Sequence, residues 1–100
     1  MLEEYLAANP SDSFARYGLA MEMVNAGQTE SALGEFKRIV SDNPDYTAAY
    51  QMWAQTLIRS GNCEEAVPVL KAGIEIAKHT GNSHAAREME TLLDDAEVAN

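Results

Sequence analysis

Hydrophobic residues recur along this chain at intervals of three and four positions, the spacing of residues on one face of an α-helix. No segment sustains the alternation of apolar and polar residues that marks a half-buried β-strand, and Ala, Leu, Glu and Met, which favour helix, dominate. Gly, Asn, Ser and Pro interrupt the pattern where helices would end and begin. The pattern predicts an all-α chain with helices over about residues 2–8, 12–26, 29–41, 45–60, 63–79 and 83–97.

The start of the helix predicted over residues 63–79 carries two local signals. Asn62, followed three residues later by Glu65, has the form of a capping box, in which each side chain satisfies a backbone N–H group of the other residue. We expect this helix start to be the best defined in the chain. Pro68 lies in the second turn and has no N–H group to donate to the carbonyl of Glu64. We therefore expect a slight kink there, on the solvent side.

The chain matches itself when it is shifted so that Asn9-Pro10 falls on Asn43-Pro44. The same shift places Gly27 on Gly61. Further identical pairs are Ala15 with Ala49, Ala20 with Ala54, Glu30 with Glu64, Ala32 with Ala66 and Lys37 with Lys71. The paired alanines allow two antiparallel helices to approach closely, so each copy is predicted to be a helical hairpin. Because each hairpin leaves an apolar face uncovered, the copies must stack.

A helix–turn–helix unit of this length, about 34 residues, closed by proline resembles the tetratricopeptide repeat. The resemblance rests on Leu19, Ala20, Met23, Gly27, Ala32, Phe36 and Pro44 in the first copy and on Tyr50, Trp53, Ala54, Leu57, Gly61, Ala66 and Leu70 in the second. It implies a right-handed α-solenoid that forms one domain over residues 1–100. We expect repeats over about residues 13–46 and 47–80, a short N-terminal helix, and a C-terminal capping helix over about residues 83–97.

Three residues depart from the family pattern. Arg16 occupies a place where a large apolar residue is common, so we expect looser packing or burial of only the aliphatic stem of Arg16. Gly73 replaces the usual Ala, which predicts a loosened second helix in the second copy. Lys78 replaces the closing Pro, which predicts that this helix continues by about a turn.

The helix predicted over residues 12–26 carries a second apolar stripe beyond the one that its hairpin partner needs. In the resembled family, the first helix of each hairpin lines a concave groove that binds peptides. The resemblance implies that nine residues line this groove: Phe14, Tyr17, Met21, Val24, Asn25, Gln51, Gln55, Ile58 and Arg59. Such a groove is apolar at one end and amide-lined at the other, which suits an apolar anchor and a peptide backbone.

The sequence therefore predicts a protein–protein interaction module that holds a peptide or protein segment in this groove. One alternative is structural: weak homodimerisation through the stripe of Phe14, Tyr17 and Met21, with no separate ligand. A second alternative is that neighbouring helices simply cover Tyr17 and Met21. Recognition of an acidic chaperone tail is not expected, because the family's carboxylate clamp needs Lys and Asn where this chain has Tyr17, Met21 and Met52.

Composition and charge narrow the range of partners. A chain of 100 residues holds one domain, and its net charge of −9 would repel the phosphates of nucleic acids and anionic lipid surfaces. We therefore expect neither nucleic acid nor a membrane as a partner. The single cysteine, Cys63, cannot form an internal disulfide, the N-terminal segment is acidic, and no apolar run approaches about 20 residues. A cytoplasmic location is the expectation.

Candidate catalytic and metal-binding residues are few. His79 and His84, with Cys63, are the residue types that bind zinc, but a structural zinc site needs four ligands and usually two close pairs. Glu64 and Glu65 next to Cys63 oppose thiolate formation. No phosphate-binding glycine loop, nucleophile elbow or His-Glu-x-x-His motif is present. The sequence predicts no enzyme activity, no metal and no cofactor.

Overall fold

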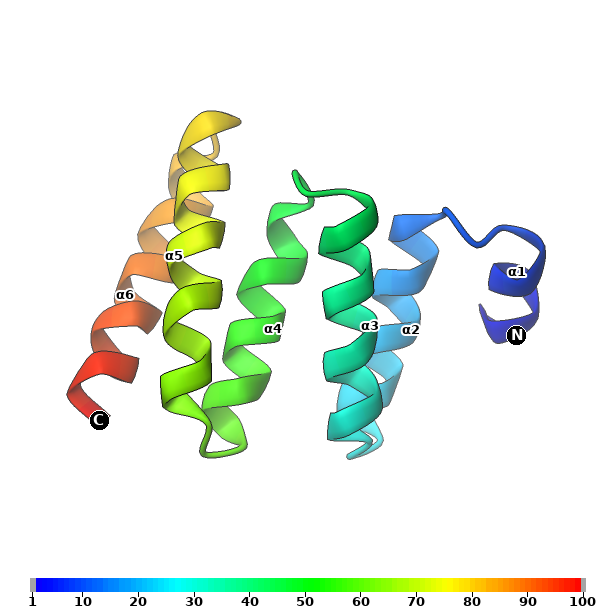
Figure 1. Cartoon of the computed structure of the whole chain (residues 1–100), viewed down its shortest axis with the longest axis horizontal. Coiled ribbons are helices and arrows are strands. Elements are labelled where there is room, and N and C mark those ends of the chain that lie inside the picture. Colours follow the sequence, from blue (N-terminus) through cyan, green and yellow to red (C-terminus); the bar gives the residue numbers. More distant parts are fainter. Residues whose placement is uncertain (1, 100) are drawn as a thin grey trace.

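The computed structural model describes residues 2–99, and these residues form six α-helices and no strand (Figure 1). The helices are α1 (Leu2–Ala8), α2 (Ser13–Asn25), α3 (Thr29–Asp42), α4 (Thr47–Arg59), α5 (Cys63–His79) and α6 (Ser83–Ala99). All six predicted helices are confirmed. The last one extends two residues beyond its predicted end.

The helices follow one another along the long axis of a flattened molecule of 41 × 30 × 18 Å (Figure 1). α2 with α3 and α4 with α5 form the two predicted hairpins, which stack through α3 and α4. At one end α1 packs against α2 and buries Leu6, and at the other α6 packs against α5 and α4. This arrangement is the predicted α-solenoid with a helix at each end.

The three tight turns between helices share one backbone geometry. Gly27, Gly61 and Gly81 have φ angles of 77°, 81° and 76°, in the left-handed region that glycine adopts without steric cost. In the first turn, the N–H of Gln28 donates to the carbonyl of Met23 at 2.8 Å, the long hydrogen bond of a Schellman motif. These glycines end the helices and reverse the chain within three residues.

The helix caps differ from the prediction. Asn62 makes no capping hydrogen bond through its side chain, so the predicted capping box with Glu65 is wrong. The ψ angle of Asn62 is 53°, outside the extended region of a typical N-cap, and its own N–H already donates to the carbonyl of Leu57 at 2.8 Å. Side-chain caps form elsewhere, at Asp12 on α2 and at Asn82 on α6.

The cap at Asp12 also ties α1 to α2. An oxygen of the Asp12 carboxylate accepts from the N–H of Ala15 at 3.0 Å, and the other oxygen accepts from the hydroxyl of Tyr5 at 2.7 Å. These two hydrogen bonds stabilise the charged form of the carboxylate, so they lower the pKa of Asp12 below its ordinary value. The same contact raises the pKa of the Tyr5 hydroxyl.

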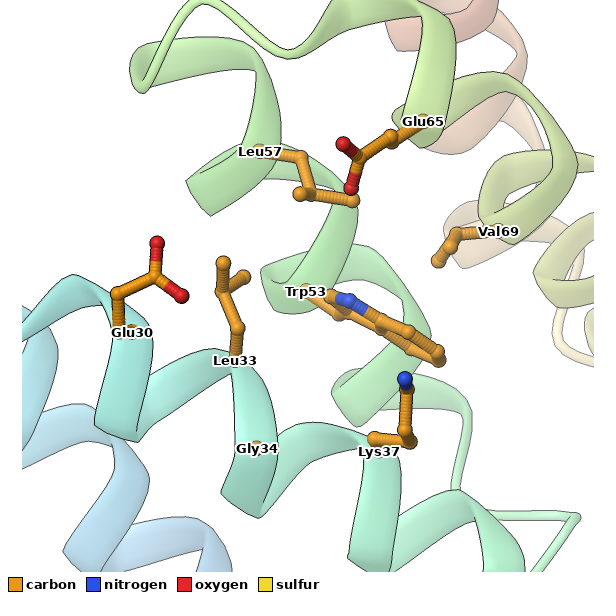
Figure 2. A pocket seen from close by; sticks show the side chains of 8 residues that line it. All are labelled: Glu30, Leu33, Gly34, Lys37, Trp53, Leu57, Glu65 and Val69. Atoms are coloured by element: carbon orange, nitrogen blue, oxygen red, sulfur yellow. The ribbon is translucent and has the colours of Figure 1, made fainter.

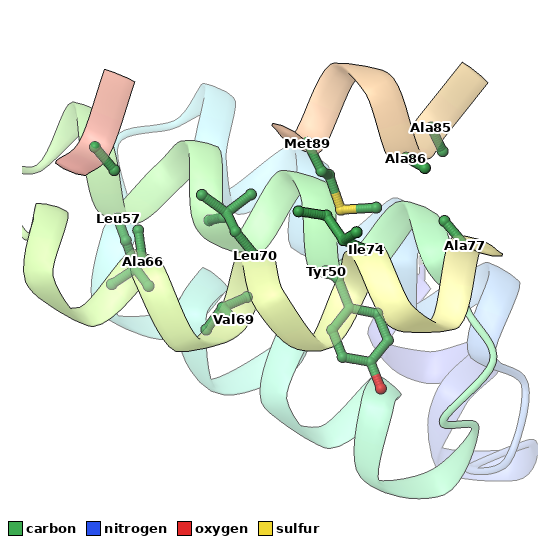
Figure 3. Packing of buried hydrophobic residues seen from close by; sticks show 12 residues of the cluster. Tyr50, Leu57, Ala66, Val69, Leu70, Ile74, Ala77, Ala85, Ala86 and Met89 are labelled. Carbon is green, nitrogen blue, oxygen red and sulfur yellow. The ribbon is translucent and has the colours of Figure 1, made fainter. Parts of the chain in front are cut away.

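Two clusters of buried side chains form the core. The first joins α2, α3 and the start of α4 around Phe36 and Ile39, which are fully buried. The second joins α4, α5 and α6 around Leu70 and Met89 (Figure 3). The four alanines predicted at the close helix contacts have no exposed surface: Ala20, Ala32, Ala54 and Ala66.

Gly73 tightens the second cluster, contrary to the expectation that it loosens α5. A Cβ atom added at Gly73 would lie 2.7 Å from the sulfur of Met89 and 2.7 Å from the Cβ of Tyr50. Such contacts are shorter than real Cβ contacts, so α5 packs between α4 and α6 only because this position has no side chain. The expectation was wrong because α6 presents Met89 at this point, which the repeat pattern did not show.

Arg16 also departs from its prediction. The whole residue is only 6% exposed, so the guanidinium is buried along with the stem. It stands 2.6 Å from the carboxylate of Glu35 on α3 and donates to the carbonyl of Pro10 at 3.1 Å. These partners make burial of the charge tolerable and connect α2 both to α3 and to the segment after α1.

Two predictions for α5 concern its length and its proline. The helix has 17 residues where α3 has 14, so the chain continues through Lys78 to His79 as predicted. Pro68 lies inside the helix on its exposed side, and the helix continues through it without a break. The slight kink expected there stays a prediction.

Candidate functional site

The predicted groove residues belong to the first helix of each hairpin, α2 and α4. Figure 1 looks onto α3 and α5, with α2 and α6 behind them. α4 contacts α6 directly, and Gln51 of α4 donates to the carboxylate of Glu88 of α6 at 3.3 Å. The surface that contains the predicted residues therefore continues onto α6.

On α2 the predicted residues divide by exposure. Phe14 is 79% exposed, and Asn25 is also exposed. Tyr17, Met21 and Val24 are half-buried and pack against the first core cluster. The stripe therefore begins with a free aromatic ring and continues with side chains that are partly packing residues.

Tyr17 shows how far this packing goes. Its ring centroid lies 6.1 Å from that of Phe36 and 5.6 Å from that of Tyr46, both in tilted contacts. Burial removes the Tyr17 hydroxyl from water and raises its pKa, and the neighbouring Tyr46 adds to this increase. The interpretation of Tyr17 as a packing residue is thus correct for one part of its ring surface.

On α4 the structure places Gln51, Gln55 and Ile58 in half-buried positions and Arg59 in an exposed one. Ile58 packs against the second core cluster, whereas the amide of Gln51 points to Glu88. The residues therefore retain partial exposure, with amide groups available beside the apolar ones.

A cavity brings two of the predicted residues together from different repeats. Val24 of α2 and Arg59 of α4 both line a space of about 500 Å³ near the turn ends of the hairpins. The other lining residues are polar: Thr29, Glu30, Thr56, Ser60 and Asn62. The predicted surface thus ends in a polar cavity that contains an arginine.

Glu88 is a residue of this surface that the repeat pattern could not identify. α2 begins at Ser13 and α4 at Thr47, one repeat later, but α6 begins at Ser83, two positions after the place where a third repeat would start. The longer α5 causes this shift, and Glu88 follows Gln51 by 37 residues. Glu88 also stands 3.3 Å from the imidazole of His84. A carboxylate with an adjacent histidine therefore lies at the edge of the predicted groove.

A second surface was not predicted at all. Between α3 and α5 lies a cavity of about 330 Å³, with Trp53 and Leu57 of α4 among its lining residues (Figure 2). An adjoining cavity of about 430 Å³ shares Trp53, Glu65 and Val69 with it. We call this surface the Trp53 groove. One sequence signal could have indicated this surface. Trp53 is much larger than Leu19, which occupies the equivalent place in the first repeat.

The candidate zinc ligands do not form a cluster. His79 and His84 are exposed, Cys63 is half-buried, and residues 2–99 contain no group of three His, Cys, Asp or Glu side chains arranged for a metal ion. Over the same part of the chain, no helix has the length and apolar character needed to cross a membrane.

Comparisons with known proteins agree with this architecture. A family model described as Tetratricopeptide repeat matches residues 23–89. A TPR repeat-containing protein of Pseudomonas aeruginosa is 27% identical over 92 residues, which cover 92% of this chain and 88% of that protein.

Solved structures extend the comparison to three dimensions. The solution structure of a tetratricopeptide repeat domain protein from Salinibacter ruber has a TM-score of 0.85 at 28% identity and covers 91% of this chain and 92% of that one. The TPR2B domain of yeast Sti1, solved as a complex with pHsp70, has a TM-score of 0.91 at 19% identity, over 99% of this chain and 79% of that one. At 19% identity, the similarity to the Sti1 domain shows a shared fold and nothing further.

Proposed function

Since the chain belongs to the tetratricopeptide repeat family, whose fold is a module for protein–protein interaction, we propose that its α2–α4 surface binds a segment of another protein. The observation that carries this proposal is Phe14. This ring is 79% exposed and stands three and seven residues before the half-buried Tyr17 and Met21 on the same helix. Aromatic side chains in such positions are typical anchors of protein interfaces.

The polar part of the surface fits the rest of a bound segment. Gln51 and Gln55 carry amides that both donate and accept hydrogen bonds, as a peptide backbone requires. Arg59, in the cavity at the turn ends, supplies a donor for a carbonyl or carboxylate of the segment. The bound segment would place an apolar side chain on Phe14 and Met21 and its main chain along α4.

Self-association through the same stripe is the competing proposal. Of its three residues, only Phe14 is largely free, because Tyr17 and Met21 are half-buried in the first core cluster. A symmetric dimer would use this stripe against its own copy, whereas a separate segment can also use the amides of Gln51 and Gln55 and the guanidinium of Arg59. The exposure pattern therefore favours a separate partner.

Affinity purification from the native cells tests the proposal. The bait variant Phe14→Ala removes the anchor and leaves the Tyr17 contacts with Phe36 and Tyr46 in place. We expect the amounts of specifically co-purifying chains to fall several-fold. Val98→Ala, which removes another exposed apolar side chain on α6, is the matched control and should retain them. Equal recovery with Phe14→Ala and the wild type would contradict the proposal.

Light scattering during dilution separates the two proposals. A monomer mass that stays constant over the dilution series supports a separate partner. A dimer that dissociates on dilution, and that Phe14→Ala abolishes, would instead support self-association through the stripe.

A further inference from the structure

The Trp53 groove differs from the proposed binding surface in that none of the nine predicted residues lines its main cavity, and the two surfaces meet only at Glu30, which also lines the polar cavity with Val24 and Arg59. One wall comes from α3, with Leu33 and Gly34, and the other from α5, with Val69. The floor is Trp53, which is half-buried between the two core clusters (Figure 2). Tryptophan combines a large apolar area with a rigid shape, and it is among the commonest residues at which binding energy concentrates.

The walls of the groove are low beside Trp53. In the adjoining cavity, the α5 side consists of Pro68 and Ala72, both exposed, next to Val69. Neither Pro68 nor Ala72 has a long side chain that could fold over the indole. From the α5 side, another helix can therefore approach the indole over Pro68 and Ala72 without meeting a long side chain at those two positions.

The charged residues around the groove differ in sign along its length. Glu30 and Glu65 lie in the first turns of α3 and α5 and both line the main cavity, where Figure 2 shows the Glu65 carboxylate beside Leu57 and the Glu30 carboxylate on the α3 side near Leu33. Lys37 lies two turns further along α3, with its ammonium group directed toward Trp53. The ion pairs formed among residues 2–99 involve none of these three.

This arrangement leaves one end of the groove negative and the other positive. A first-turn glutamate stabilises its own helix through the helix dipole, which accounts for each residue singly. That effect does not account for two such carboxylates from different helices lining one cavity together with Leu33 and Leu57. A cation of a bound partner would be attracted to both carboxylates.

We propose that the Trp53 groove binds an amphipathic helix of another protein, with a Lys or Arg between Glu30 and Glu65 and an apolar side chain on Trp53. Glu30 and Lys37 are seven residues apart, which corresponds to about 10 Å along α3, or roughly two turns of a bound helix. An acidic residue of the partner then lies near Lys37. The chain's net charge of −9 attracts such a basic segment and opposes a second copy of the chain.

The fluorescence of Trp53 tests this proposal directly, because it is the only tryptophan in the chain. The probe is a synthetic helical peptide without Trp or Tyr, with two Lys at one end, a central stripe of Leu and one Glu at the other end. Binding in the groove removes water from the indole, so we expect a saturable blue shift of the emission. A peptide that binds without changing the emission would overturn the proposal.

Charge reversal then tests the proposed direction. Glu30→Lys combined with Glu65→Lys should weaken binding of this peptide at least about tenfold. A second peptide with Glu in place of its two Lys should recover binding to that variant. The matched control is Glu64→Lys, because Glu64 is also exposed and adjacent but does not line the groove. Equal affinity of the wild type and the double variant, or equal loss in the control, would refute the proposal.

One more variant separates this surface from the proposed peptide site. Phe14→Ala should leave the peptide titration of Trp53 unchanged. If Phe14→Ala instead abolishes the shift, the peptide occupies the α2–α4 surface and the proposal for the Trp53 groove fails. The function proposed for α2–α4 is judged separately, by the recovery of partner chains. A dimer in light scattering that the Glu30→Lys and Glu65→Lys variant disrupts would show that a second copy occupies the groove, which also overturns the proposal.

Discussion

Replacing Gly73 by Ala tests whether the contact of α4, α5 and α6 depends on the absence of a side chain. The added methyl would meet Met89 and Tyr50 at 2.7 Å each. The sulfur of Met89 lies near the end of a flexible side chain and can move. The Cβ of Tyr50 is fixed to its backbone, so relief there requires α4 and α5 to separate.

Two opposing effects set the magnitude. Ala is about 1 kcal/mol more favourable than Gly inside a helix. Insertion of a methyl into a well-packed core costs about 1–3 kcal/mol. Gly34→Ala isolates the first effect, because Gly34 lies inside α3, is exposed, and an added Cβ would have no neighbour within 4 Å. The difference between the two variants therefore equals the steric cost.

Urea unfolding followed by circular dichroism gives the free energies of unfolding. We expect Gly34→Ala to be more stable than the wild type, and Gly73→Ala to be less stable than Gly34→Ala by about 1–3 kcal/mol. In a thermal scan, this difference corresponds to roughly 4–8 °C per kcal/mol for a domain of this size. Equal stability of the two variants would refute the packing argument.

Three further predictions test the caps and the buried charge. Asn82→Ala should cost about 1 kcal/mol of unfolding free energy, and Asn62→Ala clearly less because its side chain caps nothing; equal losses in urea unfolding would contradict the assignment of the caps. Glu35→Ala strands the buried Arg16 guanidinium and should cost about 3 kcal/mol in the same assay, whereas Arg16→Met should cost less; the reverse order would refute the ion pair's role. Hydrogen bonds from a backbone N–H and a tyrosine hydroxyl lower the pKa of Asp12 in the folded state, so its contribution to stability is present above its unfolded pKa of about 3.9 and is lost as pH falls through the lower folded value. With Asp12→Asn, the free energy of unfolding should fall less steeply as pH decreases through this range. An unchanged slope would contradict this linkage.

The two surfaces differ in how far their residues could be predicted from the sequence. The nine residues predicted for the α2–α4 surface follow from the position of each residue within its repeat. The Trp53 groove combines residues of three helices, and only their packing brings Glu30 and Glu65 to the same place. Glu88 joins Gln51 because α5 is longer than α3, a change that shifts the register of α6.

The sequence by itself determined the helices, the turns and the way the hairpins stack. These features depend on local physics: apolar residues at helical spacing define a buried face, and Gly27, Gly61 and Gly81 adopt positive φ angles that other residues avoid. The internal repeat then sets the same contacts twice.

Only the tertiary structure decided what Gly73, Arg16 and Trp53 do. Gly73 is needed because Met89 and Tyr50 converge on it, and Arg16 is tolerated because Glu35 and the carbonyl of Pro10 meet its charge. Each of these roles depends on atoms that are distant in the sequence and are brought within contact distance by helix packing. Interactions of this kind act over a few ångströms in space, so a periodic pattern along the chain does not contain them.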